Sequence, residues 1–151
     1  NCAGAVPTPG PRTAEDAGLL DAAAALPDQL RTLMADQQFH RALEAIWAVV
    51  GDANRYVDQQ APWTLKKTDP DRMASVLYTL AETVRRLALL TQPFTPDGMA
   101  KLLDQLAIPA DARDFTAFDA ALAPGTPLPK PEGVFPRYVA EEAASCASPP
   151  G

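Results

Sequence analysis

Hydrophobic residues recur every three or four positions through much of the chain, the spacing that places them on one face of an α-helix. This pattern predicts helices over 13–34, 37–60, 69–92 and 95–106. Each has a start signal at its beginning: Thr13 with Asp16 in a capping box, Asp36, Asp69 before Pro70, and Thr95 before Pro96. Pro27 is expected to kink or interrupt the first helix, because proline removes a backbone donor.

The second predicted helix carries the longest apolar stripe. Its members are Phe39, Leu43, Ile46, Trp47, Val50, Asn54 and Val57. The stripe predicts a core position for Trp47 and a buried amide for Asn54, which would tie neighbouring helices together or order the turn over 58–63. Gly51 lies inside this helix, where glycine costs about 1 kcal/mol relative to alanine. We therefore expect another backbone to approach it closely.

The segment after residue 60 carries an aromatic side chain beyond the end of that stripe. Pro62 either starts a short helical turn through Lys66 and Lys67 or simply ends the long helix. Trp63 follows directly and has two interpretations. Its indole could cover the end of the bundle, or it could stack on a base while the two lysines neutralise phosphates.

The whole pattern predicts an all-α protein, an antiparallel bundle of four to five helices with short joins. We expect an extended connector over 1–12 and a helical domain over 13–122. Prolines are dense from residue 124 onward, which predicts an extended tail over 123–139 that docks on the bundle, and a disordered end over 140–151. Leucine and alanine supply most of the apolar surface, and these residues favour helices over strands.

Composition and charge narrow the possible functions. The formal net charge of −6 argues against a bulk electrostatic grip on nucleic acid, but residues 28–106 hold nine basic and ten acidic side chains and are nearly neutral. The sequence shows neither a secretory signal nor an apolar run of bilayer length. Cys2 and Cys146 are interpreted as unpaired thiols in a reducing cytoplasm. Because the chain starts at Asn1, we expect it to be a piece of a longer protein.

No arrangement of catalytic residues is apparent. A glycine-rich phosphate loop is absent, and one histidine with two distant cysteines does not have metal-site spacing. His40 is interpreted as structural. The arginines Arg55, Arg72, Arg85 and Arg86 are interpreted as solvated charges on helix surfaces. We therefore expect no catalytic residue, no metal site and no cofactor in this chain.

Several stretches resemble the C-terminal anticodon-binding domain of bacterial methionyl-tRNA synthetase. They are residues 39–47 (FHRALEAIW), 53–63 (ANRYVDQQAPW), 67–70 (KTDP), 76–78 (VLY), 92–96 (QPFTP) and 133–137 (GVFPR). The likeness covers roughly residues 1–139. It implies a helical bundle of the class I aminoacyl-tRNA synthetase anticodon-binding type.

The resemblance also implies roles for individual residues. Trp63 would stack with the anticodon of methionine tRNA, and Pro62 would set its pose. Arg41 stands where the family often has a basic residue near the anticodon backbone. Asn54, Lys66 and Lys67 are expected to support this site. The family's asparagine and arginine base readers would lie on a helix before Asn1 and are not in this chain.

The family's catalytic motifs are also missing from the sequence. The resemblance implies a cytoplasmic parent enzyme that charges methionine tRNA using ATP with Mg²⁺. This chain would contribute the anticodon-binding part, with methionine tRNA and the catalytic domain as partners and with neither DNA nor membrane as a partner. By itself it is not expected to activate methionine.

Two alternatives remain open at this point. The chain could be a helical protein-interaction module without an RNA role, in which Trp63 and the proline-rich tail bind protein. It could also be the anticodon-binding domain of a related synthetase for a branched aliphatic amino acid.

Overall fold

The computed structural model of the chain describes residues 4–135 and is helical, as expected. The helices are α1 (Ala14–Ala35), α2 (Phe39–Gln60), α3 (Pro62–Thr68), α4 (Pro70–Thr91) and α5 (Pro96–Gln105), followed by the 3₁₀ turns η1 (Ala110–Ala112) and η2 (Phe115–Ala117). Within the described part of the chain, β-structure is limited to an isolated bridge between Ala5 and Pro127. The prediction of an all-α helical bundle is therefore confirmed.

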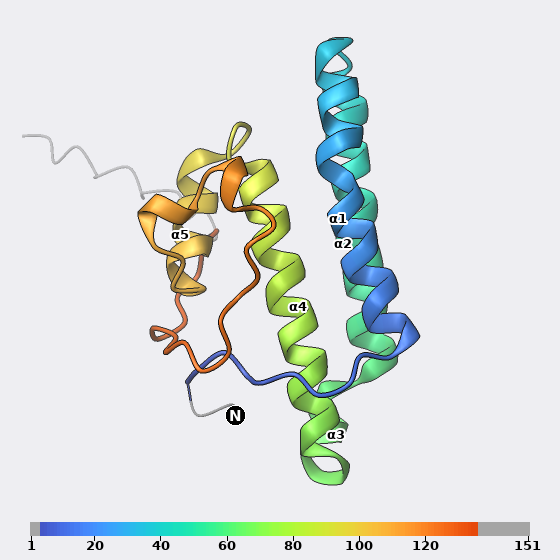
Figure 1. The fold of residues 1–151 in the computed structure, drawn as a ribbon, viewed down its shortest axis with the longest axis vertical. Helices are drawn as coiled ribbons and strands as arrows, with labels where there is room; N and C mark the ends of the chain where they lie inside the picture. The colour runs from blue at the N-terminus through green and yellow to red at the C-terminus, as the bar shows by residue number, and fades with distance from the viewer. Residues whose placement is uncertain (1–3, 136–151) are drawn as a thin grey trace, which may run out of the picture.

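Helices α1 and α2 form a long antiparallel pair, and α4 leans against it (Figure 1). The predicted capping box is present, since the Asp16 N–H donates to the Thr13 side chain and the Thr13 N–H donates to Asp16. α1 continues through Pro27, so the expected interruption is absent. Asp36 caps the end of α1 and does not start α2, which begins three residues later.

Helix α4 is the centre of the molecule. It contributes buried side chains around much of its circumference and contacts α1, α2, α3 and α5. Asp69 and Pro70 start it as predicted, and it ends at Thr91, one residue before Gln92. The main core includes Leu26 from α1, Ile46 from α2 and Leu89 from α4. α3 joins α2 to α4 at the base of the bundle (Figure 1).

The two ends of the described chain meet beside α4. The Val6 N–H donates to the Thr126 carbonyl, and the Leu128 N–H donates to the Gly4 carbonyl. Farther along, the Gln105 side chain on α5 donates to the Glu132 carbonyl. The domain boundaries we predicted stay predictions, and the end over 140–151 lies outside the described residues.

The buried face of α2 is rotated around the helix axis relative to the predicted apolar stripe. The buried residues of α2 are Ala42, Ile46, Val49 and Tyr56. Trp47 is 72% exposed, so the prediction that it belongs to the core is wrong. The stripe was broader than the face that α1 and α4 cover, and spacing alone does not show which edge of such a stripe is buried.

Two further expectations about α2 are wrong for the same reason. Asn54 is exposed, so its amide does not have to find a buried partner. A Cβ atom added at Gly51 would meet nothing within 4 Å, so no other backbone approaches it. Asn54 therefore lies at the surface of α2, and the side of Gly51 where a Cβ atom would project is open.

Candidate functional site

Trp63 projects from the short helix α3. Ala61 ends α2 in the left-handed region, with φ of 41°, and the chain turns there before Pro62 takes the first position of α3. Proline suits this position because its fixed φ matches the helix and its missing N–H is not needed. Trp63 is the next residue and is 62% exposed. The structure thus selects the helical-turn alternative for Pro62 and places the indole at the surface.

Lys66 and Lys67 lie three and four residues after Trp63 in α3, and both are exposed. This spacing places them on the same side of the helix as the indole. An aromatic face next to two ammonium groups can stack on a planar ring and contact its phosphate at once. Pro62, Trp63, Lys66 and Lys67 are therefore brought together, as expected for one site.

Arg41 lies at the opposite end of α2. It is exposed in the first turn, where its guanidinium donates to the Gln38 side chain at 2.7 Å. At 1.5 Å of rise per residue, the helix separates Arg41 from Gln60 by about 29 Å. The structure therefore does not bring Arg41 and Trp63 together. Asn54 lies between them, about two turns before the end of α2.

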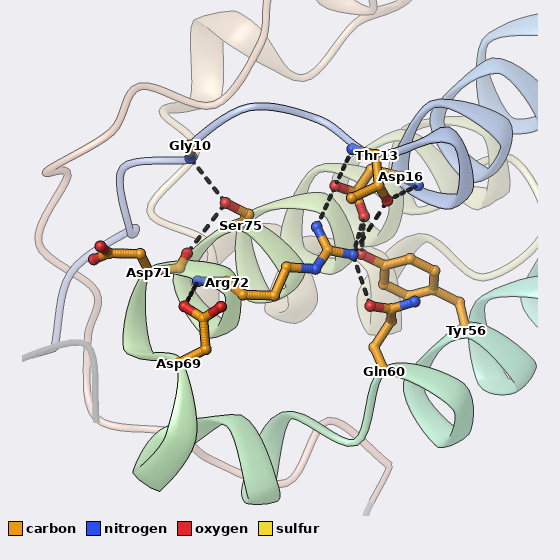
Figure 2. Close-up of polar contacts among 9 residues, drawn as sticks. All are labelled: Gly10, Thr13, Asp16, Tyr56, Gln60, Asp69, Asp71, Arg72 and Ser75. Atoms are coloured by element: carbon orange, nitrogen blue, oxygen red, sulfur yellow. Dashed lines mark hydrogen bonds and ion pairs between the residues drawn. The ribbon is translucent and has the colours of Figure 1, made fainter.

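A cluster of polar side chains ties the helices α1, α2 and α4 together (Figure 2). Arg72 in α4 donates to both carboxylate oxygens of Asp16 in α1, at 2.5 and 2.7 Å. The same guanidinium donates to the Gln60 side chain at 2.7 Å. Tyr56 donates its hydroxyl to Asp16 at 2.5 Å. We call Asp16, Tyr56, Gln60 and Arg72 the Arg72 cluster.

Burial and hydrogen bonding act in opposite directions on Asp16. Its side chain is fully buried, which raises the pKa of the carboxyl, but hydrogen bonds from Arg72, Tyr56 and the Thr13 N–H together hold that pKa well below its usual range. For Tyr56, burial and the bond to the Asp16 carboxylate raise the hydroxyl pKa. Asp16 is therefore an anion and Tyr56 a neutral donor at physiological pH.

A second buried ion pair lies farther along α4. Glu82 and Arg85 are each 2% exposed, and Arg85 also donates to the carbonyls of Ala117 and Phe118. Arg86 donates to Glu82 and to the Leu20 carbonyl. The prediction that Arg72, Arg85 and Arg86 are solvated surface charges is therefore wrong, whereas it is correct for the exposed Arg55.

Within the Arg72 cluster, the sequence indicated a structural role for Asp16 but not for its partners. Asp16 was recognised as a capping residue, but its partners lie 40 and 56 residues away. One signal was available, because Arg72 stands in the first turn of α4. A cation is unfavourable at that end of the helix dipole, which indicates a specific anionic partner.

Neither a cluster of metal-ligating side chains nor a membrane-spanning helix occurs in residues 4–135. That part of the chain holds no group of three or more histidine, cysteine, aspartate or glutamate side chains placed to bind a metal ion. Among its helices, none combines the length and apolarity needed to cross a membrane.

This architecture is an all-α domain of the class I aminoacyl-tRNA synthetase anticodon-binding type. Residues 6–148 match the family described as the anticodon binding domain of methionyl tRNA ligase. The chain belongs to that family.

Individual relatives agree with this assignment. A methionine–tRNA ligase from Mesorhizobium japonicum is 56% identical over 96% of this chain, and one from Mycobacterium leprae is 45% identical over 94%. The apo crystal structure of Mycobacterium tuberculosis methionyl-tRNA synthetase superposes on 91% of this chain with a TM-score of 0.88 at 44% identity. A complex of the same synthetase with methionyl-adenylate gives a TM-score of 0.87 over 89% of this chain.

The chain spans only part of each of these relatives. It covers 28% of the Mesorhizobium ligase, 27% of the Mycobacterium leprae ligase, and 29% and 27% of the two crystallised chains. The relatives are whole ligases, and this chain corresponds to one part of such an enzyme.

Proposed function

We propose that this chain recognises the anticodon of methionine tRNA for a methionine–tRNA ligase, with Trp63 stacking on an anticodon base. The observation that carries this proposal is the 62% exposure of an indole on a short helix that also presents Lys66 and Lys67. Stacking of a base on an aromatic side chain is worth about 1–3 kcal/mol. Because the chain is acidic overall, a specific stack of this kind matters more than general attraction to RNA.

We assign a different role to each of the other predicted site residues. Pro62 fixes the first turn of α3 and so sets the direction of the indole. Lys66 and Lys67 neutralise phosphates beside the stacked base. Asn54 is an exposed residue of α2 between Arg41 and the end of the helix, and its amide supports the site. Arg41 contacts the RNA backbone at a separate point, since α2 holds it about 29 Å away from the end of that helix.

The remaining functions belong to other parts of the ligase. The catalytic domain would use ATP with Mg²⁺ to activate methionine in the cytoplasm, whereas this chain alone would not catalyse that reaction. Phe39, Leu43 and Trp47 are spaced four residues apart on α2 and are all exposed. This apolar face supports a packing surface for the catalytic part. We expect neither DNA nor a membrane as a partner.

Substitution of Trp63 in the complete ligase tests the proposal. Trp63→Ala should lower kcat/KM for methionine tRNA by about 10- to 100-fold, which corresponds to the loss of one stack. Methionine activation without tRNA should change little. Phe115→Ala is the control, because Phe115 is 60% exposed and lies in η2, away from α3. Equal aminoacylation by Trp63→Ala and the parent would contradict the proposal.

The exposed apolar face of α2 also favours a second candidate, a protein-interaction module without an RNA role. That function would be supported if the ligase bound methionine tRNA equally well with and without this domain, while Trp47→Ala disrupted a stable complex with a protein. Loss of tRNA binding on removal of the domain would exclude it.

A further inference from the structure

Helix α3 lies against the start of α4, but its side chains are poorly anchored in the core. None of its residues is buried, and Leu65 is its only member that packs, half-buried, against the main core within the described chain. The direction of the Trp63 indole therefore depends on how the two ends of α3 are held. One end is the turn at Ala61, and the other is the start of α4 at Asp69.

The first end contains an unfavourable backbone conformation. Ala61 has φ of 41° and ψ of 61°, a left-handed conformation that costs a residue with a Cβ atom about 1–2 kcal/mol. Three local hydrogen bonds hold it: the Ala61 N–H donates to the Val57 carbonyl, and the N–H groups of Thr64 and Leu65 donate to the Ala61 carbonyl. Gln60, the residue before the turn, accepts from the Arg72 guanidinium at 2.7 Å. This contact ties the first end of α3 to α4.

The second end is tied to the same residue. The Asp69 N–H donates to the Leu65 carbonyl at 2.8 Å, which closes the last turn of α3. The Asp69 side chain accepts from the Arg72 backbone N–H at 2.9 Å. Arg72 thus holds one end of α3 through its backbone and the other end through its side chain. Figure 2 shows both contacts, with Asp69 near the Arg72 backbone and Gln60 near the far end of the Arg72 side chain.

The Arg72 side chain is itself fixed from a third direction. Asp16 in α1 is fully buried and accepts from both terminal nitrogens of Arg72, and Tyr56 orients the same carboxylate. A bidentate pair fixes the plane of a guanidinium as well as its distance. The guanidinium that reaches Gln60 therefore has one orientation relative to the bundle.

We propose that Arg72, oriented by Asp16, is a positioning residue that, together with Pro62, sets the pose of Trp63 for the anticodon base. This inference rests on the proposed function of Trp63. In this role Arg72 does not contact the base. It holds the residues on both sides of α3, Gln60 and Asp69, so that α3 presents the indole in one direction. Arg72→Lys would keep the positive charge beside Asp16. It would lose the forked guanidinium that donates to Asp16 and Gln60 at the same time.

A double-mutant cycle in the complete ligase tests this role. Arg72→Lys should lower kcat/KM for methionine tRNA by about tenfold, because a small displacement of a recognition group is costly. In the Trp63→Ala background the same substitution should cost less than about twofold, since nothing remains to be positioned. Equal losses in both backgrounds would show a purely structural role, and no loss in the parent would also overturn the inference.

A second readout observes Trp63 directly. The ligase is labelled with 5-fluorotryptophan, and the Trp63 ¹⁹F resonance is assigned by its disappearance in Trp63→Phe. Arg72→Lys should shift or broaden this resonance without RNA, whereas Arg85→Lys should leave it unchanged. Arg85 is a suitable control because it forms the other buried ion pair of α4, about 20 Å along the helix. An unchanged resonance in Arg72→Lys would overturn the positioning role.

The two readouts separate the inference from the proposed function. If the resonance moves while Trp63→Ala leaves aminoacylation intact, Arg72 positions Trp63 but the indole does not bind the anticodon. If Trp63→Ala lowers aminoacylation while Arg72→Lys affects neither readout, the anticodon stack stands and the positioning role fails. Cooperative thermal unfolding of each variant confirms that the domain is folded.

Discussion

Arg72 and Asp16 are 56 positions apart in the sequence, and the Arg72 guanidinium lies 2.5 and 2.7 Å from the two carboxylate oxygens of Asp16. The pair joins the first turn of α4 to the first turn of α1, and Gln60 adds the last residue of α2. Three helix ends therefore meet at one guanidinium. Helix α3, which carries Trp63, joins α2 to α4 at the base of the bundle (Figure 1).

Removing one member of the buried pair should be far more costly than removing an exposed one. Arg72→Met leaves the Asp16 carboxylate buried without its counter-ion, which should lower the free energy of unfolding by about 3–5 kcal/mol. Arg55→Met is the matched control, because the Arg55–Asp52 pair is exposed and should contribute less than about 1 kcal/mol. Urea unfolding of both variants measures the difference. Similar losses would contradict the structural role of the Arg72 cluster.

The low pKa of Asp16 predicts a defined dependence of stability on pH. Hydrogen bonds from Arg72 and Tyr56 outweigh burial and hold the folded-state pKa below the unfolded value of about 3.9. The unfolded chain therefore binds the proton first, and the contribution of Asp16 is present above pH 5 and lost as the pH falls below about 4. Asp16→Asn should flatten the decrease in unfolding free energy between pH 5 and 2. An unchanged slope would show that Asp16 does not carry this effect.

Two buried tyrosines in the described part of the chain, Tyr56 and Tyr78, offer a comparison of hydrogen-bond acceptors. Tyr56 donates to the Asp16 carboxylate at 2.5 Å, and Tyr78 donates to the Leu122 backbone carbonyl at 2.9 Å. A bond to a charged group contributes about 1.5–3 kcal/mol and a neutral one about 0.5–1.5 kcal/mol. Tyr56→Phe should therefore destabilise the chain more than Tyr78→Phe in thermal or urea unfolding. The reverse order would indicate that the Tyr56 bond is not formed in solution.

Gly51→Ala should stabilise the chain by about 1 kcal/mol, because alanine is the better helix former and a Cβ atom at this position meets nothing within 4 Å. Gly98→Ala is the contrasting variant in α5. There the new Cβ atom would lie 2.7 Å from the Phe135 ring, which would have to move, so the gain should be smaller or absent. Equilibrium unfolding compares the two, and destabilisation by Gly51→Ala would contradict the open environment of this residue.

Local signals allowed most of the helix boundaries to be predicted from the sequence. The capping box at Thr13, the Asp69–Pro70 start and the Pro96 start act within one turn of the chain, and the structure has all three boundaries where they were expected. Such signals depend on neighbouring residues alone. They were therefore readable without any knowledge of the tertiary fold.

Features that depend on distant partners were not predictable in the same way. Trp47 belongs to a stripe wider than its covering helices, and only the tertiary arrangement shows that its edge is exposed. Arg72 and Arg85 resemble surface residues until the segments that carry Asp16, Ala117 and Phe118 are placed. For the candidate site, Trp63 and Lys66 could be grouped because they are near neighbours in the sequence, but the distance to Arg41 required the full length of α2.

Binding of a methionine-tRNA anticodon stem–loop to the complete ligase tests the role of Trp63 most directly. Titration of labelled RNA into the parent, Trp63→Ala and Trp63→Phe should show a Kd raised about 10- to 100-fold by alanine, because one base stack is lost. Phenylalanine keeps an aromatic face and should stay within about fivefold of the parent. A Kd for Trp63→Ala equal to that of the parent would contradict the anticodon stack.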